Sequence, residues 1–105
     1  MMSNLPFPSR TQERRWFLAL QKARANRAHA AERRLRSTIS KTYQPLVSKV
    51  ATLCAKDREG ASLGDYERKG MRGLDRAIAS YDPNKSYRFP TYAIWWIRKT
   101  IKGNG

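Results

Sequence analysis

The sequence predicts an all-α fold, a small helical bundle of about four helices. Apolar residues recur at spacings of three and four along most of the chain, and nowhere do they alternate over a strand-length run. No internal repeat is present. The 105 residues suit one domain, which at this size can bury a modest core without metal ions or disulfides.

The chain begins with a segment that we expect to be a flexible lead-in, residues 1–10, because it has two prolines and little periodicity. Residues 11–36 are mostly good helix formers and predict one long basic helix, with Thr11 as its cap. The apolar stripe of this helix is thin, so we expect light packing and arginines turned to solvent or a partner. The stripe consists of Trp16, Leu20, Ala23, Ala30 and Leu35.

A second helix is predicted by apolar residues at helical spacing. They are Ile39, Tyr43, Leu46, Val47, Val50 and Cys54. Pro45 falls inside this pattern, so the helix is either kinked there or restarts near it. The segment "DREGAS" is a loop, and a third helix runs from Ser62 or Gly64 to about Ala79.

The third helix has two distinct faces. One face is apolar or small: Leu63, Tyr66, Gly70, Gly73, Leu74 and Ala77. Interior glycines cost about 1 kcal/mol each relative to alanine, so we expect another backbone or a large ring to come close to them. The other face carries Arg68, Lys69, Arg72 and Arg76. It is either a solvated surface or a contact for DNA or a partner.

The fourth helix should run from Thr91 to about Lys102, with Pro90 at its first position, after the turn "SYDPNKS". Ala93, Ile94, Ile97 and Ile101 share one sector, which predicts the core face. Tyr92, Trp95, Trp96 and Lys99 lie opposite, flanked by Arg98 and Lys102. Two interpretations remain open. The aromatics either seal the bundle, or they offer π faces for bases beside cations for phosphates.

The net charge points to a polyanionic partner. Lysine and arginine total 22 against 8 acids, a formal charge of +14, and residues 1–37 and 38–105 each contribute +7. No run approaches the roughly 18 apolar residues of a membrane span, and the first ten residues have no apolar stretch suited to secretion. We therefore expect a cytoplasmic protein.

Catalytic chemistry has little support in the sequence. His29 stands alone on an arginine-rich segment and is expected to be solvated, because metal sites and acid–base catalysis need convergent partners. Cys54 is the only cysteine; it suits a reducing compartment and is expected to be a buried, inert thiol. We predict no enzyme activity, no metal and no cofactor.

Residues 40–102 resemble a known family. The stretch "GDYERKGMRGLDRAIASYDPNKSYRFPTYAIWWIRKTI" is similar to region 2 of bacterial RNA polymerase sigma factors of the sigma-70 family, through its G-x-x-G-L and its specific "TYAIWWIR". The upstream "YQPLVSKVA" resembles the preceding helix of that region. Residues 38–105 are therefore expected to form a sigma region 2-like domain, while residues 11–36 have no clear counterpart.

The resemblance implies two contacts. In the family, this domain docks on the β′ clamp helices of the RNA polymerase core, and its aromatic segment melts and captures the non-template strand of the promoter −10 element. Tyr92 and Trp95 match positions around a flipped adenine, and Arg98 matches a phosphate-facing position. The expected DNA-binding set is Tyr87, Arg88, Phe89, Thr91, Tyr92, Trp95, Trp96, Arg98, Lys99 and Lys102. The expected polymerase-binding set is Asp65, Arg68, Lys69 and Arg72.

The chain also departs from the family pattern. Arg68 and Lys69 replace a glutamine and a glutamate of the polymerase contact, where only Asp65 stays acidic, so standard docking should be weakened. Lys99 and Lys102 replace polar residues that read the −10 element, and lysines hold phosphates more readily than they specify a base. With no later domains, we expect a region-2-only protein that would suit a bacteriophage and would work with a second transcription factor.

Three hypotheses follow from the sequence. The first is a sigma-like transcription factor that binds polymerase and promoter DNA. The second is an inhibitor or decoy that occupies the polymerase without starting transcription. The third is a general single-stranded nucleic-acid binder, whose binding would fall steeply with salt.

Overall fold

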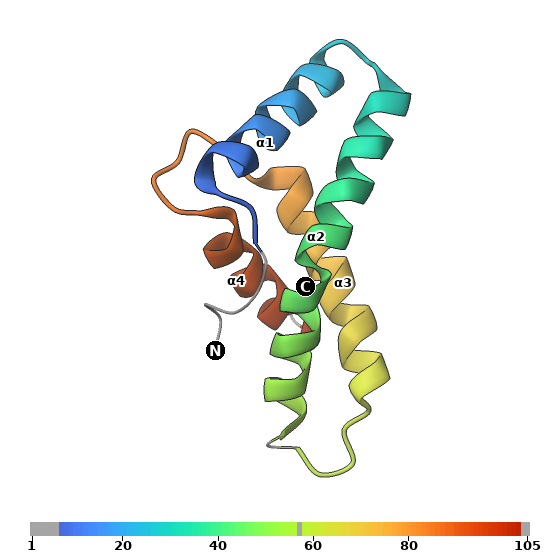
Figure 1. Ribbon diagram of the computed structural model, residues 1–105. Coiled ribbons are helices and arrows are strands. Elements are labelled where there is room, and N and C mark those ends of the chain that lie inside the picture. The colour runs from blue at the N-terminus through green and yellow to red at the C-terminus, as the bar shows by residue number, and fades with distance from the viewer. Residues whose placement is uncertain (1–6, 57, 104–105) are drawn as a thin grey trace.

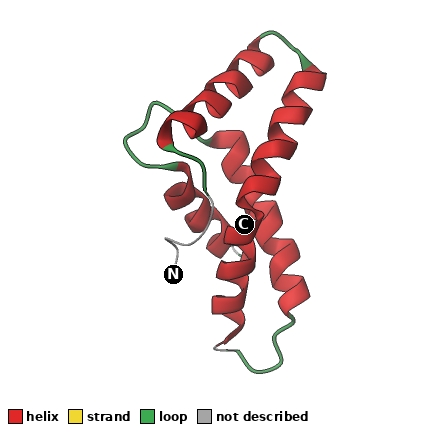
Figure 2. Cartoon of the chain, viewed as in Figure 1, coloured by secondary structure: helices red, strands yellow, loops and turns green. Residues whose placement is uncertain are grey.

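The protein is an elongated bundle of four helices (Figures 1 and 2). The computed structural model describes residues 7–56 and 58–103. The helices are α1 (Arg10–Ala25), α2 (His29–Lys56), α3 (Leu63–Ser80) and α4 (Phe89–Ile101). These described residues contain no strand, and the all-α prediction is confirmed. The molecule measures 47 × 27 × 20 Å, and α2 runs along most of its length.

The predicted single helix over residues 11–36 is wrong. The chain leaves α1 at Asn26, and Arg27 takes a left-handed φ of 53° before α2 begins at His29. This turn folds α1 back along the upper part of α2 (Figure 1). The break carries no glycine or proline, so the alanine-rich and arginine-rich composition concealed it. The N-cap of α1 is Ser9, whose hydroxyl accepts from the Gln12 N–H at 3.1 Å.

Helix α1 belongs to the core, contrary to the light packing expected from its sequence. Phe17 and Leu20 are fully buried, and Ala23 nearly so, whereas Trp16 is only half-buried. The lead-in is also partly fixed, because the Phe7 ring packs on Tyr43 with 5.2 Å between centroids. Residues 1–6 of the predicted lead-in lie outside the described residues.

Helix α2 passes through Pro45 without restarting. Pro45 is exposed, so its ring stands clear of the core, and the lost hydrogen bond to the Lys41 carbonyl is the cost of its place in the helix. The apolar face buries Ile39, Tyr43, Leu46, Val47, Val50 and Ala51 as predicted. Cys54, expected to be buried, is only half-buried near the end of this helix.

Helices α3 and α4 pack at very short range because of Gly73. A Cβ there would lie 2.6 Å from the Trp96 carbonyl oxygen and 2.9 Å from the Ile97 Cα. At Gly70, a Cβ would lie 2.8 Å from the Val47 Cγ1 of α2. The predicted close approach is confirmed, and at Gly73 it is the backbone of α4 that approaches. This contact fixes the rotation of α4 about its own axis.

We expect Gly73→Ala to lower the free energy of unfolding by about 1 to 3 kcal/mol, because backbone atoms of α4 cannot move aside for the added methyl group. Gly64→Ala is the control, since the nearest neighbour of a Cβ there would be the Ser62 Oγ at 3.9 Å. That change should be neutral or add up to about 1 kcal/mol through helix propensity. Urea unfolding of the two variants measures both effects. If Gly73→Ala and Gly64→Ala raise the free energy of unfolding equally, the close packing at Gly73 is contradicted.

Candidate nucleic-acid interface

Helix α4 presents two chemically different sides. Ala93, Ile97 and Ile101 are buried, as predicted, and Ile94 is half-buried. On the other side Trp95 is 55% exposed, the most exposed large apolar side chain among the described residues. Exposing an indole to this extent forfeits burial energy, so the outer side of α4 is the leading candidate for a binding surface.

Cations surround Trp95. The Lys99 Nζ lies 4.7 Å from the Trp95 ring centroid and 5.2 Å from that of Trp96. The indole borders a shallow depression of ≈ 360 Å³. The depression is lined by Thr91, Ile94, Trp95, Arg98, Lys99 and Lys102. A flat aromatic face with three cations at its edge can stack a base and hold the adjoining phosphates. The structure thus brings together five of the predicted DNA-binding residues.

Trp96 differs from Trp95 in its surroundings. It is half-buried against the core, perpendicular to the Trp95 ring at 5.2 Å, with the Arg76 guanidinium of α3 5.8 Å from its centroid. Its Nε1 is buried and has no acceptor among the described residues. Trp96 therefore fits the interpretation that the aromatics seal the bundle, at the α3–α4 junction, whereas Trp95 faces outward and its stacking on a base stays a prediction.

Tyr87 and Tyr92 form a separate aromatic pair at the start of α4. Their rings stack at 5.8 Å with 25° between planes, and Tyr87 is 39% exposed. The Tyr92 hydroxyl lies 2.7 Å from the Ser80 Oγ. Tyr92 therefore stacks on Tyr87 in this structure, and the sequence-based expectation that it pairs with Trp95 around one base remains a prediction.

Phe89 corrects the predicted DNA-binding set. Its side chain is 0% exposed and contacts the rings of Phe17, Tyr43 and Tyr81 at 4.7, 4.8 and 5.3 Å. The prediction that Phe89 contacts DNA is wrong, because no part of the ring is available to a base. The chain turns inward at the start of α4, and Phe89 joins three other elements in the core.

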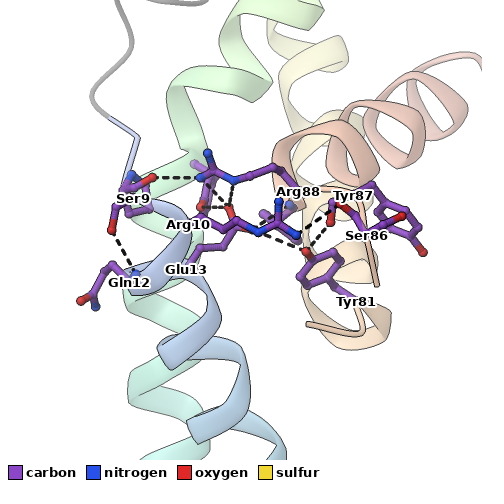
Figure 3. Close-up of polar contacts among 11 residues, drawn as sticks. Ser9, Arg10, Gln12, Glu13, Tyr81, Ser86, Tyr87 and Arg88 are labelled. Atoms are coloured by element: carbon purple, nitrogen blue, oxygen red, sulfur yellow. Dashed lines mark hydrogen bonds and ion pairs between the residues drawn. The ribbon is translucent and has the colours of Figure 1, made fainter. Parts of the chain in front are cut away.

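Arg88 is held by Glu13 of α1 (Figure 3). Its Nη2 donates to the Glu13 Oε1 at 3.0 Å and to the Pro8 carbonyl at 3.0 Å. The Glu13 side chain is 3% exposed, and its Oε2 accepts from the Phe89 N–H at 3.0 Å. A carboxylate on the first N–H groups of a helix satisfies a donor and favours the helix dipole. Arg88 thus has a structural partner, which the DNA-contact prediction did not anticipate.

Two tyrosines complete the polar contacts around Glu13. The Tyr43 hydroxyl donates to the Glu13 Oε1 at 3.2 Å. The Tyr81 hydroxyl donates to the Tyr87 carbonyl at 2.7 Å and lies 3.5 Å from the Glu13 Oε2. Burial, followed by the Glu13 charge, raises the pKa of Tyr81 to about 12 and raises the pKa of Tyr43 above its ordinary value. The neutral phenols stabilise the fold below pH 10, and this contribution is lost as the pH rises through the folded-state pKa of Tyr81.

The sequence missed Glu13 as a key residue. An acid such as Glu13 in an arginine-rich segment is expected to lie on the surface. No helical spacing links position 13 to position 88. The serine-capped start of α1 places a glutamate in its first turn, which is only a weak signal.

The outer face of α3 is basic. Asp65, the acid that the family resemblance retains, forms an ion pair with Arg68 one turn away. Arg72 is exposed and Lys69 is half-exposed. The four predicted polymerase-binding residues therefore lie on one helix as expected, but the single carboxylate among them already has a cation. Repulsion between like charges therefore disfavours binding of this face to a partner whose own surface is basic.

Within residues 7–56 and 58–103, no three His, Cys, Asp or Glu side chains lie together in a way that could hold a metal ion. His29 is exposed at the start of α2. None of the helices described is both long enough and apolar enough to cross a membrane.

Comparison with known proteins gives the family. The family model described as Sigma-70 region 2 matches residues 39–103, which covers α3, α4 and most of α2. The chain belongs to the sigma-70 region 2 family. Helix α1 and the first third of α2 lie outside the matched residues. The family assignment confirms the resemblance expected from "TYAIWWIR", while nothing found here bears on a phage origin.

Individual relatives agree with this assignment. The chain is 52% identical over 42 residues to the RNA polymerase sigma-C factor of Nostoc sp., covering 40% of this chain. It is 38% identical over 77 residues to the probable RNA polymerase sigma-C factor of Synechocystis sp., covering 71%. It is 32% identical over 81 residues to the chloroplastic RNA polymerase sigma factor sigD of Arabidopsis thaliana, covering 77%. The chain spans only 10%, 16% and 19% of the length of these three relatives.

Replacing Glu13 should destabilise the whole domain. We expect Glu13→Gln to cost about 2 to 4 kcal/mol, because Arg88 and two buried donors lose their anion; the 38% exposure of Arg88 keeps the cost below that of a fully buried pair. Glu32→Gln is the matched control. Glu32 pairs with Arg24 at 3.5 Å and Arg36 at 4.0 Å nearer the surface, so it should cost at most about 1 kcal/mol. Urea unfolding compares the two, and equal costs would refute the structural role of Glu13.

The two sides of α4 should respond differently to truncation. We expect Ile97→Ala to cost about 2 to 5 kcal/mol, because it leaves a cavity in the core. Trp95→Ala should change stability by at most about 1 kcal/mol, because more than half of the side chain is already in water. Thermal unfolding followed by circular dichroism measures both. If Trp95→Ala is as damaging as Ile97→Ala, the outer side of α4 is not a free surface.

Proposed function

We propose that this chain is a sigma-like transcription factor that binds a bacterial-type RNA polymerase and captures the non-template strand of the promoter −10 element on the outer side of α4. Such a factor works in the compartment of that polymerase, the bacterial cytoplasm or nucleoid. Because the chain spans a small part of its relatives, each contact needs support from this chain's own residues.

The exposed Trp95 under Lys99 is the observation that carries the proposal. A stacked base gains about 1 to 3 kcal/mol, which offsets the few kcal/mol needed to take a base out of the duplex. Arg98, Lys99 and Lys102 border the same depression and can neutralise phosphates on either side of that base. Tyr87 and Tyr92 extend the aromatic surface toward the start of α4. The family membership supplies the polymerase and promoter as the setting.

Polymerase docking is assigned to the outer face of α3, with Asp65, Arg68, Lys69 and Arg72 as the contact residues. The same face supports a second candidate function, an inhibitor or decoy that occupies the polymerase without opening DNA. What favours it is the ion pair between Asp65 and Arg68, which leaves a basic surface where the family resemblance calls for an acidic one. A contact that differs from the standard one could hold a polymerase without aligning it on a promoter.

Co-elution and promoter opening test the first function directly. Purified protein should co-elute with core polymerase and make thymines near a −10 element reactive to permanganate. Trp95→Ala should keep co-elution and lose the permanganate signal by about tenfold, as expected when one stacked base contributes more than 1 kcal/mol. A protein that does not bind core polymerase would refute the proposal. The inhibitor would instead reduce transcripts when it is added to a complete holoenzyme.

A further inference from the structure

Three cations of α3 surround a small depression beside the end of α4. Lys69, Arg72 and Arg76 lie at positions i, i+3 and i+7, and they line it together with Thr100 and Gly103. The depression measures ≈ 190 Å³. None of the three side chains forms a hydrogen bond or an ion pair with another residue in the described part of the chain. Three cations around one hollow make an anion the natural occupant.

Repulsion among these closely spaced cations lowers the stability of the free protein. Lys69 and Arg72, and then Arg72 and Arg76, are like-charged neighbours on a helix, and such pairs are destabilising. Among the described residues, no acid forms an ion pair with these three cations: Asp65 pairs with Arg68, and Asp75, three positions after Arg72, forms no ion pair. A bound anion would remove the repulsion.

The depression continues the aromatic surface of α4. Arg76 lies over the Trp96 ring at 5.8 Å, and Lys99 lies over both Trp96 and Trp95. Aromatic rings and cations therefore alternate from α4 onto α3. Within the described part of the chain, the buried Trp96 Nε1 has no acceptor.

Size and composition favour a phosphate over other anions. Sites for drug-sized ligands occupy roughly 300 to 1,000 Å³, so this hollow suits a single phosphate group and excludes a whole nucleotide. Its lining has no aromatic or large aliphatic side chain. Protein contacts usually depend on such anchors, which speaks against an acidic protein segment.

We propose that the Lys69–Arg72–Arg76 pocket binds a backbone phosphate of the single strand whose base stacks on Trp95. This inference rests on the proposed capture of single-stranded DNA. It implies that the bound strand continues from α4 across α3. It also gives Lys69 and Arg72 a contact with nucleic acid in addition to the polymerase contact proposed above.

The salt dependence of single-strand binding tests the pocket. The probe is a fluorescent oligothymidine of about 12 nucleotides, followed by anisotropy at several KCl concentrations. Each lost phosphate contact on a single strand lowers the slope of log K against log salt by about 0.7. Loss of this one contact in Lys69→Gln with Arg72→Gln should therefore reduce the slope by about 0.7. Arg76 stays in place, so the packing on Trp96 is preserved.

Arg33→Gln with Arg34→Gln is the control, because it removes the same charge from exposed sites near the start of α2. This control should leave the slope unchanged. Circular dichroism confirms that both double variants are folded. An equal fall in slope for both would show a general charge effect and overturn the pocket.

The remaining outcomes separate this inference from the proposed function. If Trp95→Ala weakens oligothymidine binding while Lys69→Gln with Arg72→Gln leaves the slope unchanged, single-strand capture stands and the phosphate pocket is wrong. If that double variant instead loses co-elution with core polymerase at an unchanged slope, the face is a protein contact and the pocket is again wrong. If the unaltered protein does not bind oligothymidine, single-strand capture fails together with the pocket.

Discussion

The buried Glu13 carboxylate is the interaction on which the arrangement of the domain depends. It joins α1 to the segment before α4, because one oxygen accepts from Arg88 and the other from the Phe89 N–H. A carboxylate with so little exposure is tolerated only when its acceptor sites are filled, and here a guanidinium, a backbone N–H and the Tyr43 hydroxyl fill them. The start of α4 is thereby fixed against α1, and Phe89 is drawn into the core among three other rings.

A second constraint, the contact at Gly73, decides which side of α4 meets solvent. Because the backbone of α4 lies against α3 at this point, the helix can take only one rotation, with Ile97 inward. Trp95, two positions earlier, then has to point outward. The exposure of Trp95 thus follows from steric fit at a glycine on another helix, and the positive surroundings of its ring come from Arg98, Lys99 and Lys102 on its own helix.

The positive charge of α3 distinguishes this chain from the pattern that the resemblance implies for the sigma-70 region 2 family. The aromatic surface keeps the features needed to stack bases, whereas α3 carries a row of cations with only one ion-paired acid. Net positive charge raises affinity for any polyanion and makes that affinity depend on salt. The proposed binding of DNA should therefore rest more on phosphates than on base identity. The proposed contact with a polymerase would involve residues that are basic where the resemblance implies an acidic surface.

The sequence by itself determined the all-α class, the family, both faces of α3 and the inward isoleucines of α4, because local periodicity and a specific motif encode each of these. It did not determine the break at Asn26–Ala28, the burial of Phe89 or the partner of Arg88. The last two features depend on residues about 75 positions apart that meet only when α1 folds back, and no local pattern records that meeting. The two tryptophans show the same division: the helical wheel placed them on one side, and only packing against Arg76 and the core made one of them structural and left the other exposed.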